Sequence, residues 1–196
     1  MIPLIRNFLG IPGIHYLVTR FGGPRLRAAS FDQKFNRGDW DFNLDRSAEL
    51  VSVVEQYAHK GHILMLGCGS ASIVSALAPE CFAEFVGVDI SPEAISRASR
   101  RATPRIRFTI GDCTTYACER AYDLILFSES LYYISPFHRK ALLKRLASHL
   151  APTGSIVVTI ADPKRYSGIV CMIRKNFSVI EDRPFQSGDR HLIVFR

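Results

Sequence analysis

The sequence predicts an α/β fold built around a parallel sheet whose strands are covered on both faces. Strand-like and helix-like segments follow one another from residue 44 onwards, an order typical of that class. Tyr122–Phe127 is almost wholly apolar after Asp123, as expected of a strand buried on both sides. Two glycines directly after the first strand candidate mark a tight turn from strand to helix. At 196 residues the chain should form one domain that buries about 70% of the surface its unfolded form exposes.

The glycine turn follows His62–Leu66, a short apolar strand candidate. Gly67 and Gly69 let the backbone turn without a Cβ clash and approach a ligand closely. The apolar residues of Ser72–Ala78 then have helical spacing, and Pro79 marks the expected end of that helix. The segment is therefore predicted to run from strand through turn to helix.

An acidic residue follows the next strand candidate directly. Phe85–Val88 is apolar, and Asp89 follows at its carboxyl end, 22 residues after Gly67 (89 − 67). A carboxylate in that place can accept two hydrogen bonds from a ribose diol. The spacing therefore predicts a site for an adenosine-containing cofactor. Ser72 replaces the third glycine of the dinucleotide fingerprint, which weakens the case for a pyrophosphate ligand without excluding it.

The remaining elements continue the alternation. A helix is predicted from residue 44 to Tyr57, stopped by Gly61, and another from Ser91, an N-cap candidate, to about Arg101. Further strands are predicted at Arg105–Ile110, at Ser155–Ile160 after a turn over 150–154, and at Phe177–Asp182 and Arg190–Phe195 in the tail.

In this order the motifs resemble those of the class I S-adenosylmethionine-dependent methyltransferases. The resemblance covers roughly residues 44–196 and is carried by LMLGCGSAS, GVDIS, IGDC, YDLILFSESLYYI and LAPTG. It implies a Rossmann-like sheet of seven strands with the last strand antiparallel, helices on both faces, and S-adenosyl-L-methionine as cofactor. The residues that the resemblance assigns to cofactor binding are Gly67, Cys68, Gly69, Asp89, Ile90, Asp112, Cys113 and Ser128.

Two positions depart from the family pattern. Met65 stands where the family usually has an acid that helps to hold the methionine amino group, and Ala71 stands where glycine is usual. The first departure leaves open how the amino-acid end of the cofactor is held. The nucleoside site is unaffected.

Residues 1–43 are expected to form an N-terminal helical lid on a cofactor-binding domain of residues 44–196. The first 30 residues are apolar and basic, and a helix over the cofactor cleft is favoured there over a weak membrane-surface contact through residues 1–20. The aromatic block that follows resembles the lids of class I enzymes. Phe35 and Trp40 are its candidate cofactor contacts, because aromatic faces attract a sulfonium cation.

The candidate catalytic residues are Glu129, Tyr132 and Tyr133, directly after the fourth strand. Reactive groups in open α/β sheets gather at the carboxyl ends of strands. Glu129 could act as a base or bind an amine, and the tyrosines could orient the acceptor. His138 could also be a base, but a place on a helix surface is favoured for it. The Glu-x-Leu-Tyr-Tyr block is similar to sugar-modifying enzymes, including the nodulation-factor N-methyltransferases, which favours a small-molecule or glycan-derived acceptor.

Composition narrows the functional classes. The net charge is +7, but no nucleic-acid motif accompanies the closely spaced arginines, so a solvated surface is favoured for them. Five cysteines without a CxxC pair indicate neither a zinc site nor a disulfide framework, and no metal is expected. A cytoplasmic protein without a transmembrane segment is predicted.

The favoured function is methyl transfer to a small molecule or a glycan-derived acceptor. Other uses of the cofactor, such as cyclisation or alkyl transfer that releases methylthioadenosine, and a non-catalytic partner protein remain as alternatives. The sequence assigns no oligomeric state.

Overall fold

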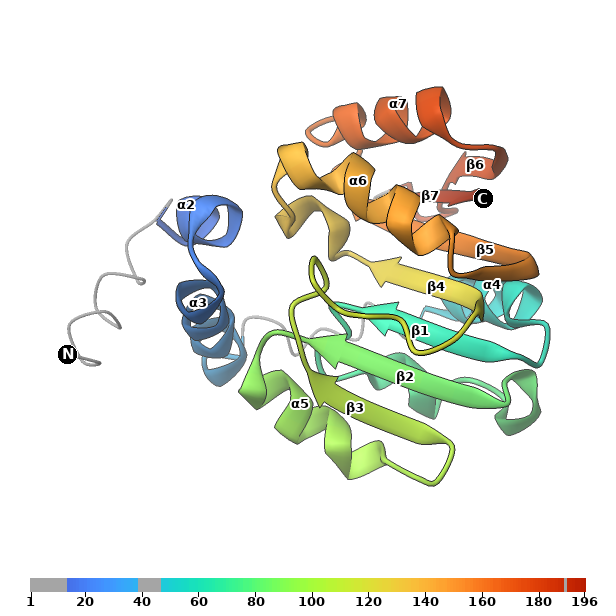
Figure 1. Ribbon diagram of the computed structural model, residues 1–196, viewed down its shortest axis with the longest axis horizontal. Helices are drawn as coiled ribbons and strands as arrows, with labels where there is room; N and C mark the ends of the chain where they lie inside the picture. Colours follow the sequence, from blue (N-terminus) through green and yellow to red (C-terminus); the bar gives the residue numbers. More distant parts are fainter. Residues whose placement is uncertain (1–13, 39–46, 189) are drawn as a thin grey trace.

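The protein is described from a computed structural model, which places residues 14–38, 47–188 and 190–196. Seven strands form one sheet in the order β3-β2-β1-β4-β5-β7-β6 (Figure 1). The pairs β3·β2, β2·β1, β1·β4 and β4·β5 are parallel, whereas β7 runs antiparallel to both β5 and β6. The predicted sheet, including its antiparallel last strand, is confirmed. The strands are β1 His62–Leu66, β2 Glu84–Asp89, β3 Ile106–Ile110, β4 Tyr122–Ser128, β5 Leu150–Ala161, β6 Val179–Pro184 and β7 Arg190–Phe195.

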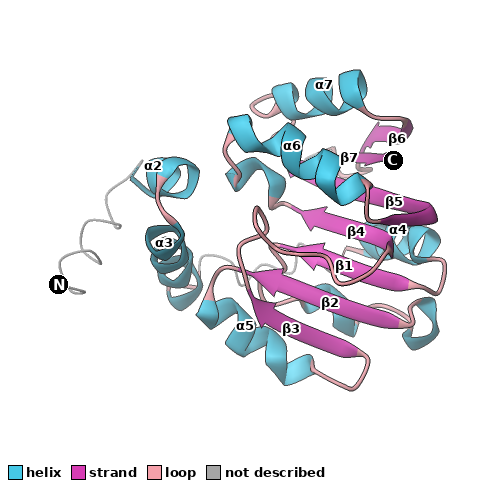
Figure 2. Cartoon of the chain, in the orientation of Figure 1, coloured by secondary structure: helices cyan, strands magenta, loops and turns pink. Residues whose placement is uncertain are grey.

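Helices cover both faces of the sheet, as predicted (Figure 2). Alternate residues of β1 point to opposite faces: Ile63 and Met65 belong to one buried cluster and Leu64 and Leu66 to the other. The first cluster includes apolar residues of α4 and α5, and the second includes those of α6 and α7. These helices are α4 Ala48–Ala58, α5 Pro92–Ala98, α6 Pro136–Ala147 and α7 Ser167–Asn176.

Two N-terminal helices lie beyond the carboxyl ends of the parallel strands (Figure 1). They are α2, Ile14–Phe21, and α3, Pro24–Asn36. Helix α3 packs against α5, and α2 packs against the 3₁₀ turn Leu131–Tyr133. Of residues 1–43, which were predicted to form a helical lid, the described ones, 14–38, contain these two helices. In the part of the chain that is placed, no helix is long and apolar enough to cross a bilayer.

The prediction of a helix over Ser72–Ala78 is wrong. The segment forms only a short 3₁₀ helix, Ser72–Ser75, and a second one follows at Pro79–Cys81. Ala78 is extended, because the proline that follows it disfavours helical backbone there. The apolar spacing is nevertheless real, since Ile73, Val74 and Leu77 are all buried.

Two other predicted boundaries also moved. The turn expected over 150–154 belongs to β5, where Leu150 pairs with Tyr122 before the register shifts. The first core helix ends at Ala58, because His59 and Lys60 adopt left-handed backbone with φ of 50° and 58°. Gly61 was expected to end this helix, but the structure shows another reason for a glycine there. A Cβ there would lie 1.8 Å from the Asp123 carboxylate, which accepts the His62 N–H.

The closely spaced arginines contact neighbouring loops and strands. Arg101 donates to the Ser70 carbonyl at 3.1 Å, and Arg107 pairs with Glu84 at 2.8 Å. Arg97 reaches from α5 to the Phe35 carbonyl of α3 at 2.8 Å. These contacts are structural, in line with the surface role favoured from the sequence.

Candidate active site

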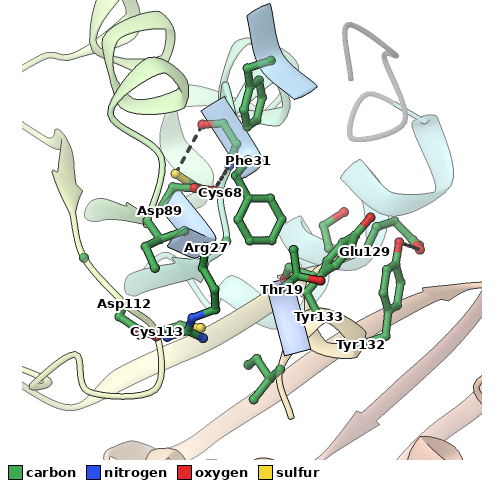
Figure 3. Close-up of a pocket in the computed structure, with 18 of the residues that line it drawn as sticks. Thr19, Arg27, Phe31, Cys68, Asp89, Asp112, Cys113, Glu129, Tyr132 and Tyr133 are labelled. Carbon is green, nitrogen blue, oxygen red and sulfur yellow. Dashed lines mark hydrogen bonds and ion pairs between the residues drawn. The ribbon is translucent and has the colours of Figure 1, made fainter. Parts of the chain in front are cut away.

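A cavity of about 190 Å³ lies where the parallel strands end and α3 crosses them (Figure 3). Almost every residue predicted for the site lines it. Only Trp40 is not placed, because it lies outside the described residues. The predicted residues on the cavity wall are Phe35, Gly67, Cys68, Gly69, Asp89, Ile90, Asp112, Cys113, Ser128, Glu129, Tyr132 and Tyr133.

The glycine turn forms the floor between β1 and β2. Gly67 and Gly69 have φ of 69° and 55°, the left-handed region that favours glycine. Both the Gly67 and Cys68 N–H groups donate to the Val88 carbonyl, at 2.8 and 3.0 Å. Ala71 is also left-handed, with φ of 51°, which gives a physical reason why glycine is usual at that place.

Asp89 is fixed at the end of β2 by two backbone donors. The Gly69 N–H donates to its Oδ2 at 2.8 Å, and the Ser91 N–H donates to its Oδ1 at 2.9 Å. Burial raises the pKa of this carboxyl above its ordinary 3.8, while the hydrogen bonds from Ser91 and Gly69 act to lower it. Each carboxylate oxygen can accept more than one hydrogen bond, so ribose hydroxyls can add to these contacts.

Asp112 lies after β3 and is held from two sides. Its Oδ1 accepts from the Thr114 N–H at 2.9 Å and from the Thr114 hydroxyl at 2.8 Å. Its Oδ2 forms an ion pair with Arg27 of α3. Beside it, burial raises the pKa of the Cys113 thiol to about 12, so this side chain stays protonated and apolar in character at neutral pH.

Sequence reasoning missed Arg27 as part of the site, and Phe31 was not assigned to it. Arg27, Phe31 and Phe35 are spaced four residues apart, which places them on one face of α3, and all three line the cavity. That spacing is the signal that could have found them. Asp32 of the same helix accepts from the Ser91 hydroxyl and from the Glu93 N–H at 3.2 Å.

Glu129 occupies the opposite end of the cavity, directly after β4. Its backbone is left-handed with φ of 51°, a conformation that costs a non-glycine residue roughly 1–2 kcal/mol. Its N–H donates to the Thr159 hydroxyl at 3.2 Å, and its carboxylate accepts from the Ala161 N–H and from the Tyr132 hydroxyl at 3.4 Å. Both ends of the residue are therefore tied to neighbouring parts of the chain.

Aromatic rings surround Glu129. The rings of Tyr132 and Tyr133 lie 4.7 Å apart, Phe31 meets Tyr133 edge-on at 5.3 Å, and Tyr166 stacks on Tyr132 at 4.5 Å. Burial raises the pKa of Tyr133 to about 12 and that of Tyr132 further still. Both phenols therefore stay neutral near pH 7 and can orient a ligand without acting as bases. His138 is exposed on α6 and does not line the cavity.

The donor set suits an adenosyl cofactor. The left-handed glycine turn leaves room for close approach, Asp89 is a fixed acceptor, and apolar groups such as Ile90 and Cys113 flank the acids. Met65, which replaces the acid usual in the family, is fully buried in the core and does not line the cavity. Among the residues that the structure places, no cluster of ligands for a metal ion occurs.

Comparisons with known proteins agree with this geometry. Residues 63–154 match a family model described as a methyltransferase domain. Trans-aconitate 2-methyltransferase of Methylobacterium radiotolerans is 39% identical over 50% of this chain and 36% of its own length. Nodulation protein S of Rhizobium tropici is 29% identical over 59% of this chain and 50% of its own length. The chain thus spans half or less of these curated relatives.

A solved structure has a similar fold. The N-methyltransferase NodS from Bradyrhizobium japonicum, in complex with S-adenosyl-L-homocysteine, superposes with a TM-score of 0.64 at 23% identity. The match covers 82% of this chain and 90% of that one. Residues 63–154 thus match a methyltransferase-domain model, and the motif order and sheet topology are similar to those of the class I S-adenosylmethionine-dependent methyltransferases.

Proposed function

We propose that this chain transfers the methyl group of S-adenosylmethionine to a small-molecule or glycan-derived acceptor. One observation carries the proposal: Asp89, the acid assigned to the ribose, and a polar, aromatic-lined end lie in the same cavity. Asp89 is at one end and Glu129 with two tyrosines is at the other. A cofactor anchored at Asp89 would therefore direct its reactive end towards Glu129.

The cofactor's nucleoside is assigned to the β2 and β3 ends. Asp89 accepts the ribose hydroxyls, and Ile90 and Cys113 provide apolar contacts for adenine beside Asp112. The glycine turn of Gly67 and Gly69 lets the backbone reach the amino-acid part closely. Phe31 and Phe35 cover the cavity from α3 and exclude water.

The bound cofactor supplies a methyl group already activated by positive sulfur. The protein's part is to hold the acceptor in line with that methyl, an effect worth up to about 7–11 kcal/mol. Tyr132 and Tyr133 remain hydroxyl donors at neutral pH, and Glu129 is the acidic group at this end of the cavity. These residues are assigned to positioning the acceptor.

A second use of the cofactor is kept in view because Met65 is buried away from the cavity. Without the usual acid, the amino-acid part is held by other groups. If the bond between the cofactor's sulfur and its amino-acid chain were broken instead, methylthioadenosine would be released without any acceptor.

The test is a calorimetric titration with S-adenosylmethionine, S-adenosylhomocysteine and NAD. We expect binding of the two adenosyl compounds alone, and its loss in Asp89→Ala. Glu119→Ala is the matched control, since it removes an acid whose side chain is 58% exposed at the far surface. Binding of NAD instead, or full binding by Asp89→Ala, contradicts the proposal. Methylthioadenosine formed from the cofactor alone would favour the second chemistry.

A further inference from the structure

We infer that the acceptor presents a basic amine, that its nitrogen is methylated, and that Glu129 is the residue that selects it. This inference rests on the proposed function and names the chemical class of the acceptor. Three features of the cavity support it: the sign of its charge, the fixed position of Glu129, and the aromatic rings around that carboxylate.

The cavity has an acidic lining. Of the described residues on its wall, three are carboxylates, Asp89, Asp112 and Glu129, and one is a cation, Arg27. Arg27 is already paired with Asp112. Among the described lining residues, carboxylates therefore outnumber cations, and a carboxylate or phosphate acceptor fits this balance of charge less well than an amine does. An ammonium or amine group meets the opposite situation, because Glu129 attracts it.

Glu129 is held away from the proposed nucleoside site, at the end of the cavity assigned to the acceptor. Asp89 and Asp112 lie at the ends of β2 and β3, on the nucleoside side, whereas Glu129 follows β4. Its left-handed backbone and its contacts with Thr159 and Ala161 fix the carboxylate against β5. Strain of this kind at a site is characteristic of a preorganised functional group.

The rings add to the attraction. Phe31, Tyr132 and Tyr133 line the same end of the cavity, and Tyr166 stacks behind Tyr132. Figure 3 shows Glu129, Tyr132 and Tyr133 grouped together, apart from Asp89 and Asp112. Aromatic faces attract cations by roughly 0.5–2 kcal/mol each, more when water is excluded. An acidic group among aromatic rings is a cation-binding arrangement.

Glu129 also suits the charge change of the reaction. The acceptor enters as a neutral amine, having lost its proton to solvent, and its lone pair forms the N–C bond. The S–C bond breaks, and its electron pair stays on sulfur. Positive charge thus moves from sulfur to nitrogen, next to Glu129, which stabilises the charge as it develops. The product leaves as the methylated ammonium ion, so the one proton released overall is the proton that the acceptor lost before the attack. A carboxylate acceptor would undergo the same change of charge, so the discrimination comes from binding, where a carboxylate is repelled by Glu129 and an amine is not.

The experiment uses two sets of probes of matched size: benzylamine, benzyl alcohol and benzoate, and glucosamine, glucose and glucuronate. Trans-aconitate is added because one relative is named for it. Full-length protein that has been shown to bind S-adenosylmethionine is incubated with each probe, and S-adenosylhomocysteine and the methylated product are measured. We expect product from the amines and a preference of at least about tenfold in kcat/KM over the other probes.

Glu129→Gln is the diagnostic variant, because it keeps the size of the side chain and removes its charge. We expect a fall of roughly 100-fold in kcat/KM for the amine, the size typical of a removed electrostatic contact at a reacting centre. Glu129→Asp should recover part of the loss. Cofactor binding by both variants should stay as in the original protein, which shows that they are folded.

The outcomes separate the two proposals. If the cofactor binds but hydroxyl or carboxylate probes are preferred, or no amine is methylated, the inference is wrong while the cofactor site stands. An unchanged kcat/KM for the amine in Glu129→Gln also overturns it. Absence of cofactor binding overturns the proposed function instead, and the inference with it.

Discussion

At Asp89 two opposing effects act on one carboxylate. Burial favours the protonated form, whereas the N–H groups of Ser91 and Gly69 favour the ionised form. Burial dominates, so the pKa is raised, and the folded state becomes less stable as the pH rises through that value. Such a cost is expected where a carboxylate is kept for binding a ligand.

Cofactor affinity should therefore depend on pH. In the proposed site, ribose hydroxyls donate to ionised Asp89, so affinity for S-adenosylhomocysteine should fall as the pH drops through the raised pKa, above the ordinary 3.8. Below it the fall should approach about tenfold per pH unit. Calorimetry across a pH series measures this, with Asp89→Asn expected to bind weakly and without that dependence. An affinity that stays constant down to ordinary carboxyl pKa values would contradict the assignment.

The two left-handed glycines should differ in their tolerance of a methyl group. A Cβ at Gly67 would lie 2.6 Å from the Ser130 Cβ, whereas one at Gly69 would lie 3.4 Å from the Phe35 ring. Left-handed backbone costs either alanine about 1–2 kcal/mol, and the clash should add about 1–3 kcal/mol at Gly67 alone. Urea unfolding of Gly67→Ala and Gly69→Ala tests this. Equal losses would show that Ser130 shifts without cost.

Among elements, α3 is the one that joins the lid to the cofactor site. Arg27 binds Asp112 on one side of the cavity, and Asp32 binds the Ser91 hydroxyl at the start of α5 on the other. Phe31 and Phe35 line the cavity from the same helix. The helix is thus attached to both sides of the proposed nucleoside site, and we predict that cofactor entry is faster when one attachment is open.

Removing the Arg27 attachment should speed cofactor entry. In Arg27→Met the apolar length of the side chain remains, but its ion pair with Asp112 is lost. We expect association with S-adenosylhomocysteine to be about fivefold faster, the equivalent of roughly 1 kcal/mol. Stopped-flow fluorescence can measure the rate. Exposed Arg25 of the same helix offers the control Arg25→Met. Slower association, or weaker binding at equilibrium, would show that Arg27 contacts the bound cofactor.

On the scale of the whole molecule, the two buried clusters contain no described residue of the lid. Both buried clusters are made of residues from Leu50 onwards, on the two faces of one sheet. The lid contributes separate contacts, such as the hydrogen bond from Arg97 to the Phe35 carbonyl. This division supports the proposed boundary between residues 1–43 and 44–196.

Deletion of residues 1–43 should leave a folded protein that binds the cofactor poorly. The fragment should retain cooperative melting by circular dichroism, because both clusters stay complete. Its affinity for S-adenosylhomocysteine should fall at least about tenfold, since loss of Phe31 and Phe35 admits water to the site. Loss of cooperative melting would show that the lid belongs to the core. Unchanged affinity would show that it does not cover the cofactor.

Local patterns determined much of this protein. The apolar runs of β1, β2 and β4, the glycine turn and Asp89 each follow from neighbouring residues, because strand burial and left-handed turns are short-range properties. The family resemblance then supplied the number of strands and the antiparallel direction of the last one. Where apolar spacing alone was used, at Ser72–Ala78, it identified the buried residues but gave the wrong type of element. A buried 3₁₀ turn and a buried helix share that pattern.

Tertiary structure alone decided the contacts between distant residues. Arg27 meets Asp112 across 85 positions of sequence, and Glu129 meets Ala161 across 32. The left-handed backbone of Glu129 is likewise imposed by its ties to β5, since no local residue preference favours it. The sequence by itself determined which residues surround the cavity from the strand ends, because parallel strands bring those ends together. Only the packing of α3 and β5 decided how the acids are paired, because charge pairing depends on distance in space.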